Sequence, residues 1–504
     1  MQPIQVPRGT PRAACASVVF ASLSLAASSY AQGQSIPEAT QFKESRDGIG
    51  HMLVVPYYTV QAGNATLLNI VNTDRRNGKA VKVRFRGARN ADDVFNFTLF
   101  LSPGDVWAAE ISLNRQTGLA QLSTADDSCT LPTNVNRDFN TDRVRPDSVW
   151  AETREGYIDI ITMADLVEGS PVYAATKHEY NKLPAPCSLD AEAPPALKAL
   201  ETEAGVSAAG FGVPTSGLFA NWSIFNVANA TSWAGAAAAI VAVDKEGVVG
   251  SGKVVVHPQA AGTPTGAVSD WTSDPLLRSG GVAIQHFDLP DLSTPYVGGI
   301  TAVQQAALLS GVWAKTSVRN EYFTDDRVNA ATDWVFTLPT RRYSMAVDYA
   351  ASKMVYTVLS PEYFNASNVW FSNGIDSCIR STPFIFWNRA SQYWNDPKEV
   401  DDYGIPQPDM AYWINLCGAA SVLHYETSGR SALNAAVAVD KKGMAFGFKD
   451  GWGEVFTRGL NNVGLPIVGA AFAKATSTNI GAGISGNFGL TWPHRYTRPS
   501  AGAQ

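Results

Sequence analysis

Short segments in which apolar and polar residues alternate recur along the chain. In the clearest of them, residues 81–86, three apolar residues alternate with Lys82, Arg84 and Arg86. Successive side chains of a strand point to opposite faces, so this pattern predicts a strand with one apolar and one cationic face. Similar runs between turn residues lie at 52–60, 65–72, 94–101, 106–112 and 157–163. Because no long helical period separates them, we expect a mainly β protein with two antiparallel β-sandwich, Ig-like domains and short helical linkers.

The expected domain boundaries follow from turn-rich and helical segments. The junction contains Pro194-Pro195, then helix-forming residues, then Gly205, which is the order typical of a short helix. A second short helix is expected over 302–310. We therefore expect a signal peptide at 1–31, a lead-in at 32–50, a β-sandwich at 51–188, a helical and Pro-rich junction at 189–212 and a larger β-sandwich with insertions at 213–504.

A six-residue segment occurs twice in the chain with one difference, which raises the question of a duplication. Residues 242–247 and 438–443 are identical at five of six positions, and each copy follows an Ala- and Val-rich run. The two copies are either the remnants of a duplicated sandwich or two hairpins with the same turn-forming Asp and Gly. Because six residues are too few to establish a repeat, we favour the explanation that two hairpins have the same turn residues.

The N-terminus has the layout of a secretory signal peptide. Arg8 and Arg12 precede a run of small and apolar residues without an acid, and Ser29-Tyr30-Ala31 supplies small residues around a cleavage point. An N-terminal membrane helix is the alternative, but the run is short and rich in Ala and Ser. Cys15 begins the apolar run instead of ending it, which argues against lipidation. We expect an exported protein that is secreted, periplasmic or held at the cell surface, without a transmembrane span.

The cysteine content agrees with export. Loss of the signal peptide removes Cys15 and leaves four cysteines, an even number that is typical of disulfides in a secreted chain. Four cysteines allow three pairings, and pairing of neighbours keeps each bridge within one expected domain: Cys129 with Cys187 and Cys378 with Cys417. Metal binding is the competing use, but no Cys-x-x-Cys or Cys/His spacing is present.

Composition and motifs exclude several functions. The formal charge of −6 gives no basic footprint for nucleic acid. Loss of residues 1–31 removes two Arg and no acid, which changes that charge to −8. No zinc-protease, serine-hydrolase, P-loop, dinucleotide or haem motif occurs, and the six His residues are scattered singly. We therefore favour a non-catalytic protein over an enzyme, with no catalytic residue assigned.

Three groups of residues are candidate binding sites. The cations Lys82, Arg84 and Arg86 could bind anionic groups such as lipopolysaccharide phosphates, although a solvated face paired with Asp92 and Asp93 is the simpler interpretation. Acidic, amide-rich turns at 320–326 and 136–142 could bind calcium, but neither matches a defined calcium loop. No other cofactor is expected.

The third group is the aromatic and acidic region 370–413. Sugar rings stack on flat aromatic side chains, and a pair of carboxylates can hydrolyse a glycosidic bond. The region could equally be a loop closed by the Cys378–Cys417 bridge, with its aromatics buried. Its candidate glycan-binding residues are Trp387, Trp394, Trp413, Asp401 and Asp402.

Several phrases give a partial family resemblance. Residues 53–60 (LVVPYYTV), 102–107 (SPGDVW) and 332–340 (TDWVFTLPT) resemble those of a functionally uncharacterised group of secreted or cell-surface proteins of Gram-negative bacteria. The resemblance runs through most of the chain and implies a role at the envelope surface. The group has no catalytic motif to carry over.

Together these observations predict an exported structural or adhesive protein of the cell surface. It would self-associate in the manner of a surface layer or bind envelope glycans or lipopolysaccharide. The alternative is a secreted carbohydrate-active enzyme with its acids between 376 and 409. A periplasmic ligand-binding protein is a third option, which the missing βαβ alternation disfavours.

Overall fold

The structure is a computed structural model of residues 1–504. It describes residues 36–141, 144, 149–178, 187, 193–201, 205, 208–250, 302–348, 353–356, 362–372, 376–394, 412–426, 429–443, 447–457, 459–481 and 484–499. Pro37–Gln504 forms one compact unit; the other unit, Met1–Ile36, contains the predicted signal peptide and lies outside the described residues except for Ile36. With 53% strand and 11% helix, the protein is mainly β, as predicted.

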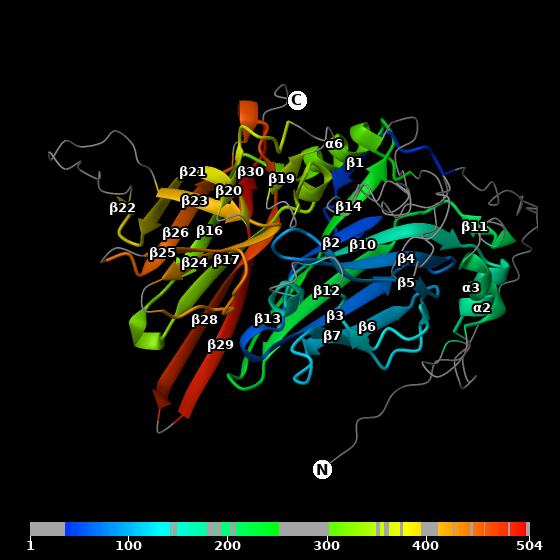
Figure 1. The fold of residues 1–504 in the computed structure, drawn as a ribbon, viewed down its shortest axis with the longest axis horizontal. Coiled ribbons are helices and arrows are strands. Elements are labelled where there is room, and N and C mark those ends of the chain that lie inside the picture. The colour runs from blue at the N-terminus through cyan, green and yellow to red at the C-terminus, as the bar shows by residue number, and fades with distance from the viewer. Residues whose placement is uncertain are drawn as a thin grey trace, which may run out of the picture. The chain divides into compact units, whose positions relative to one another are not determined.

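Within the described residues, the largest sheet has eight strands (Figure 1). In spatial order these are β1 (Gln41–Glu44), β14 (Ala238–Val243), β2 (Met52–Thr59), β10 (Glu155–Leu166), β4 (Gly78–Gly87), β5 (Asp93–Leu101) and β8 (Cys129–Leu131), with β11 (Phe211–Gly212) on β10. All of these pairs are antiparallel. Both β4 and β10 are buried along their whole length, so this sheet is covered on both faces there.

A described sheet of six strands contributes to the same core. Its order is β13 (Thr231–Ala236), β12 (Leu218–Asn226), β3 (Asn64–Asn72), β6 (Val106–Leu113), β7 (Ala120–Ser123) and β9 (Arg137–Asp138). Strands β12 and β14 follow the expected junction 189–212 in sequence, yet β12 pairs with β3, and β14 pairs with β2 and β1. The sheets of the first half therefore extend to Val243.

The second half of the described chain forms two further large sheets. The seven-stranded sheet has β20 (Val369–Ser372), β21 (Asp376–Asn388), β26 (Asp450–Phe456), β16 (Ser317–Phe323) and β30 (Arg495–Thr497), with β22 (Tyr393–Trp394) and β23 (Tyr412–Cys417) also on β21. The five-stranded sheet has β25 (Val439–Gly443), β24 (Ala420–Glu426), β17 (Ala331–Thr337), β28 (Val468–Gly481) and β29 (Ile484–Pro493). Two-stranded sheets join β15 (Ala314–Lys315) to β27 (Leu465–Pro466) and β18 (Met345–Asp348) to β19 (Lys353–Tyr356).

The five-stranded sheet buries both of its faces in different cores. On β17, Trp334 belongs to a cluster shared with the seven-stranded sheet, whereas Val335 belongs to the cluster shared with the eight- and six-stranded sheets. The alternation is that of any strand, but here both alternating faces are apolar. On the same sheet Phe472 lies 6.3 Å from Tyr57 and 5.6 Å from Trp222 between ring centroids. This aromatic contact joins strands from the two halves of the sequence.

The described helices are short. They are α1 (Val149–Thr153), α2 (Pro171–Thr176), α3 (Pro195–Lys198) and α6 (Ala302–Trp313), with 3-10 turns at Gln61–Gly63, Ala199–Glu201, Asp326–Val328, Arg341–Tyr343 and Leu460–Asn462. Helix α2 begins at Pro171 and is capped by Ser170, whose side chain accepts a hydrogen bond from the Tyr173 N–H. No described helix combines the length and apolarity that crossing a bilayer requires.

Both expected disulfides are present. Cys129 bonds to Cys187 and Cys378 to Cys417. The first bridge lies in a small apolar cluster with residues of α2 and α3, and the second joins residues that are directly opposite on β21 and β23. The bridges therefore fasten local structure in each half of the chain.

The two copies of the repeated six-residue segment, 242–247 and 438–443, differ in structure. In the first copy β14 ends at Val243, and Asp244 and Gly247 form a turn closed by the Gly247 N–H. In the second copy Val439–Gly443 is a strand that runs parallel to β24. Neighbouring strands, rather than the shared local sequence, decide which conformation is adopted.

Candidate functional site

An exposed aromatic pair lies on the outer face of the seven-stranded sheet, the face away from its core. Trp387 on β21 and Trp452 on β26 are directly opposite in register. Their rings are stacked, with centroids 3.8 Å apart and planes inclined by 7°. Trp452 is 38% exposed and Trp387 is partly buried, whereas the adjacent Phe386 is in the core. Strand alternation therefore presents two indole rings to solvent as a single unit.

Ion pairs flank this Trp387–Trp452 pair. Asp450 and Glu454 lie two positions before and after Trp452, so they share its face of the sheet. The Arg389 Nε lies 3.1 Å from Asp450 Oδ2, and the Arg319 Nη2 lies 2.6 Å from Glu454 Oε1. Flat apolar rings can pack against the C–H face of a sugar, while charged groups beside them can hydrogen-bond its hydroxyls. The arrangement is thus chemically suited to a glycan.

Other predicted members of the aromatic and acidic region are only partly placed. Trp394 lies opposite Phe386 where β22 pairs with β21, and Trp413 lies on β23. Asp401 and Asp402 lie outside the described residues, as do the remaining acids of 396–409. Asp376 is described, and its Oδ1 lies 3.5 Å from Arg89 Nη1. Sequence reasoning missed Trp452, because it is distant from Trp387 along the chain and only strand pairing brings them together.

The cationic strand is buried instead of solvated. Lys82, Arg84 and Arg86 are all buried on β4. The Arg86 Nε lies 3.0 Å from Asp159 Oδ2 on the adjacent β10, and the Arg84 Nη1 lies 3.8 Å from Asp93 Oδ2. Of the two expected acidic partners, Asp93 is thus near Arg84, whereas Asp92 pairs with Arg342 at 2.8 Å. Binding of an external anion by these cations stays a prediction.

The expected calcium turn at 320–326 contains acids that already contact cations. Asp325 accepts hydrogen bonds from Arg327, and Asp326 lies 2.7 Å from Arg430 and 3.1 Å from Lys449. No group of three His, Cys, Asp or Glu that could hold a metal ion occurs among the residues the structure describes. The turn at 136–142 is described only in part, so calcium binding there stays a prediction.

A buried Asp–His pair has the wrong geometry for a catalytic triad. Asp333 accepts hydrogen bonds from Ser431 Oγ at 2.6 Å and from the Leu433 N–H at 2.8 Å, and it contacts His424 Nδ1 at 2.7 Å. In a triad the serine donates to the histidine, but here it donates to the aspartate. This cluster therefore fixes the loop before β25 against the five-stranded sheet.

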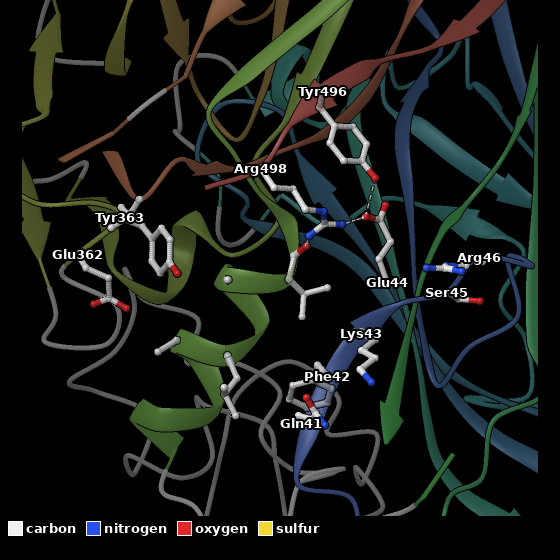
Figure 2. A pocket seen from close by; sticks show the side chains of 15 residues that line it. Gln41, Phe42, Lys43, Glu44, Ser45, Arg46, Glu362, Tyr363, Tyr496 and Arg498 are labelled. Atoms are coloured by element: carbon white, nitrogen blue, oxygen red, sulfur yellow. Dashed lines mark hydrogen bonds and ion pairs between the residues drawn. The ribbon is translucent and has the colours of Figure 1, made fainter. Parts of the chain in front are cut away.

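A pocket of about 1240 Å³ lies beside β1 and α6 (Figure 2). Its lining combines apolar groups, such as Leu308 and Val312, with the charged side chains of Lys43 and Arg46. Figure 2 shows Glu44 directed toward Tyr496 and Arg498, with Tyr363 on the opposite side. The pocket thus has a mixed lining, in which one wall is built around a single carboxylate.

The Glu44 carboxylate joins three strands. Its Oε2 accepts hydrogen bonds from Lys315 Nζ at 3.2 Å, from the Tyr496 hydroxyl at 3.0 Å and from Arg498. The Lys315 ammonium also lies 3.7 Å from the Tyr496 ring centroid. Burial lowers the pKa of Lys315 to about 8, and the charge of Glu44 opposes that shift. Lys315 and Arg498 share the Glu44 carboxylate. These charged groups therefore hold β1, β15 and the C-terminal segment together.

Comparisons were made with models of protein families, with curated proteins and with solved structures, and none of them found a match for the chain.

Proposed function

We propose that this chain is an exported, non-catalytic protein of the cell envelope that binds surface glycans through the outer face of the seven-stranded sheet. The observation that carries the proposal is the stacked Trp387–Trp452 pair, in which Trp452 is 38% exposed and Trp387 is partly buried. Leaving Trp452 exposed and Trp387 only partly buried forgoes some of the burial that would otherwise stabilise the fold, and a flat aromatic surface of this kind supports a binding role.

The ion pairs beside the aromatic pair support a polar ligand over an apolar one. Asp450 and Glu454 supply acceptors, and Arg389 and Arg319 supply donors, on either side of the rings. An apolar partner would leave these groups desolvated without new partners, which is costly. A sugar has hydroxyls for the charged groups and a C–H face for the rings, so it satisfies both.

The proposal includes the cellular location of the protein and its domain architecture. The N-terminal pattern, the two disulfides and the resemblance to surface proteins of Gram-negative bacteria support export to an oxidising compartment. We infer that the eight- and six-stranded sheets form one Ig-like β-sandwich and the seven- and five-stranded sheets a second. An apolar cluster joins the members of each pair, and the five-stranded sheet also packs against the first cluster, where the two sandwiches would meet.

Binding to immobilised envelope glycans tests the function. The wild-type protein is expected to be retained on lipopolysaccharide glycan or capsular polysaccharide. The Trp387→Ala/Trp452→Ala double variant is expected to lose retention, whereas Phe225→Ala, which removes an aromatic side chain of the six-stranded sheet with 38% exposure, retains it. Equal retention of all three proteins would contradict the proposal. Sedimentation of the same samples measures self-association, which the sequence predicts as the alternative to glycan binding.

A further inference from the structure

A small polar pocket of about 130 Å³ lies apart from the aromatic face. It is enclosed by the turn after β12, by the paired strands β28 and β29 and by the loop before β25. Its walls include Lys474, Thr476 and Asn487 from the strands, and Asn229 and Asn434 from the two loops. Drug-sized ligands need several hundred Å³, so this pocket suits a single small polar group or ring.

Hydrogen bonds fix the walls of the pocket. The Trp233 Nε1–H donates to the Ala473 carbonyl at 2.8 Å, and the Asn487 side chain donates to the carbonyl of Asn229. These contacts join β13 to β28 and the β12–β13 turn to β29. The site is therefore built from backbone segments that are already held together.

Several polar groups in the pocket keep hydrogen-bonding capacity. Within the described part of the chain, the side chains of Asn229, Asn434 and Thr476 make no hydrogen bond, and the Asn487 Oδ1 accepts none. An amide both donates and accepts, and so does a hydroxyl. Sugar hydroxyls have the same dual capacity, which makes them suitable partners for such a lining.

Lys474 supplies one positive charge. It is half-buried, and burial lowers its pKa. Among the described residues no acid lies within ion-pair distance of it; the nearby Asp333 carboxylate is occupied by Ser431 and Leu433. The charges of Asp333 and Arg430 act on Lys474 in opposite directions, Asp333 raising its pKa and Arg430 lowering it. One ammonium without an ion-pair partner of its own among the described residues matches a monoanion, whereas a phosphate monoester would bring a second negative charge with no partner.

We propose that this pocket binds a sugar acid, a monosaccharide ring with one carboxylate, either free or at the end of an acidic glycan. The carboxylate would pair with Lys474, and the ring hydroxyls would contact Asn434, Asn487 and Thr476. No residue of the Trp387–Trp452 face takes part, so this proposal can fail while the proposed function holds, and the reverse.

Calorimetric titration of the full chain with D-glucuronate, its uncharged methyl ester and glucose tests the site. Glucuronate is expected to bind about tenfold or more tightly than either neutral sugar, because a hydrogen-bonded charge pair discriminates by that amount. Lys474→Met should weaken glucuronate binding by about tenfold or more, and Lys474→Arg should retain it. Lys245→Met, at an exposed turn, is the matched control and should not change it. Asn434→Gly keeps the positive φ of 54° and should also weaken binding.

Three results would overturn the proposal. They are the absence of glucuronate binding to the folded wild type, equal binding of glucuronate and glucose, and unchanged binding in Lys474→Met. Acetate or sulfate that binds as tightly as glucuronate would also overturn it, because the ring would then contribute nothing. An oligosaccharide ending in glucuronate distinguishes the two sources: competition at equal or lower concentration than the free sugar supports a glycan end, and failure to compete supports the free acid.

Discussion

Glu155 on β10 accepts a hydrogen bond from the backbone N–H of Ala436 at 2.7 Å, although the two residues lie 281 positions apart. The same carboxyl accepts hydrogen bonds from the Tyr57 hydroxyl at 2.9 Å and from the Val437 N–H at 3.4 Å. Burial raises the pKa of Glu155 to about 7, the hydrogen bonds opposing that shift. One buried acid thus links the eight-stranded sheet to the loop before β25.

The raised pKa of Glu155 predicts a loss of stability as pH increases. Between pH 4.5 and about 7 the folded protein holds a proton that the unfolded chain releases, so the free energy of unfolding falls as pH rises through this window. The pKa difference corresponds to about 3 kcal/mol. Urea unfolding at pH 5 and pH 8 should show that Glu155→Gln gains stability relative to the wild type by about this amount. Parallel pH profiles of the two proteins would refute the assignment.

His494 should act in the opposite direction. Because the Val335 carbonyl, 2.9 Å from Nε2, can only accept, Nε2 carries the proton and Nδ1 accepts from Asn320. Burial lowers the pKa of this neutral ring to about 4. Unfolding therefore takes up a proton between pH 6.5 and about 4, and stability is lost as pH falls. The pH dependence of the free energy of unfolding in this window should be weaker in His494→Gln than in the wild type, and an equal dependence in the two proteins would contradict the assignment.

Removing the charge of Glu44 should lower the pKa of Lys315 further. The carboxylate is what partly offsets the effect of burial on that ammonium. In Glu44→Gln we expect the pKa of Lys315 to fall from about 8 by about one unit or more, as read from NMR titration of ¹³C-methylated lysines. Glu362→Gln, on the other side of the same pocket, should leave it unchanged. A pKa that stays constant or rises in Glu44→Gln would show that another group controls Lys315.

Loss of the Cys378–Cys417 bridge should destabilise the fold without changing its topology. The bridge closes a separation of 39 residues, for which the loop-entropy model gives about 4 kcal/mol. Replacing both cysteines by Ala leaves no free thiol and should lower the free energy of unfolding in guanidinium by about that amount. If oxidised wild type and double variant unfold at the same denaturant concentration, the bridge does not constrain the unfolded chain.

Local patterns in the sequence were sufficient to predict a mainly β protein and the disulfide pairing. Strict alternation around residues 81–86 identifies β4, and the even cysteine count with neighbour pairing matches both bridges. What alternation cannot show is what covers a polar face. Arg84 and Arg86 are buried because Asp93 and Asp159 accompany them, and Asp159 belongs to a strand distant in sequence.

Only one of the two tryptophans of the candidate site could be predicted, because local sequence does not show which strands lie side by side. Trp387 stands out in an aromatic-rich and acidic segment, whereas Trp452 lies 65 positions further along the chain in a glycine-rich stretch. Only the pairing of β21 with β26 brings the two rings together. The pocket around Lys474 is assembled from three segments, none of which carries a recognisable motif. Sites built across strands depend on register, which local sequence does not encode.

The most direct test of glycan binding by the outer face is calorimetric titration of the chain with an oligosaccharide from the envelope glycan that retains it. For the wild type we expect a measurable dissociation constant, weakened by about tenfold or more in each of Trp387→Ala and Trp452→Ala, because truncating an aromatic side chain at the centre of a binding surface typically costs about 2 kcal/mol. The Phe225→Ala control, on the six-stranded sheet, should bind as the wild type does. Binding of equal strength in all four proteins, with folding intact, would contradict the assignment of this face as the glycan site.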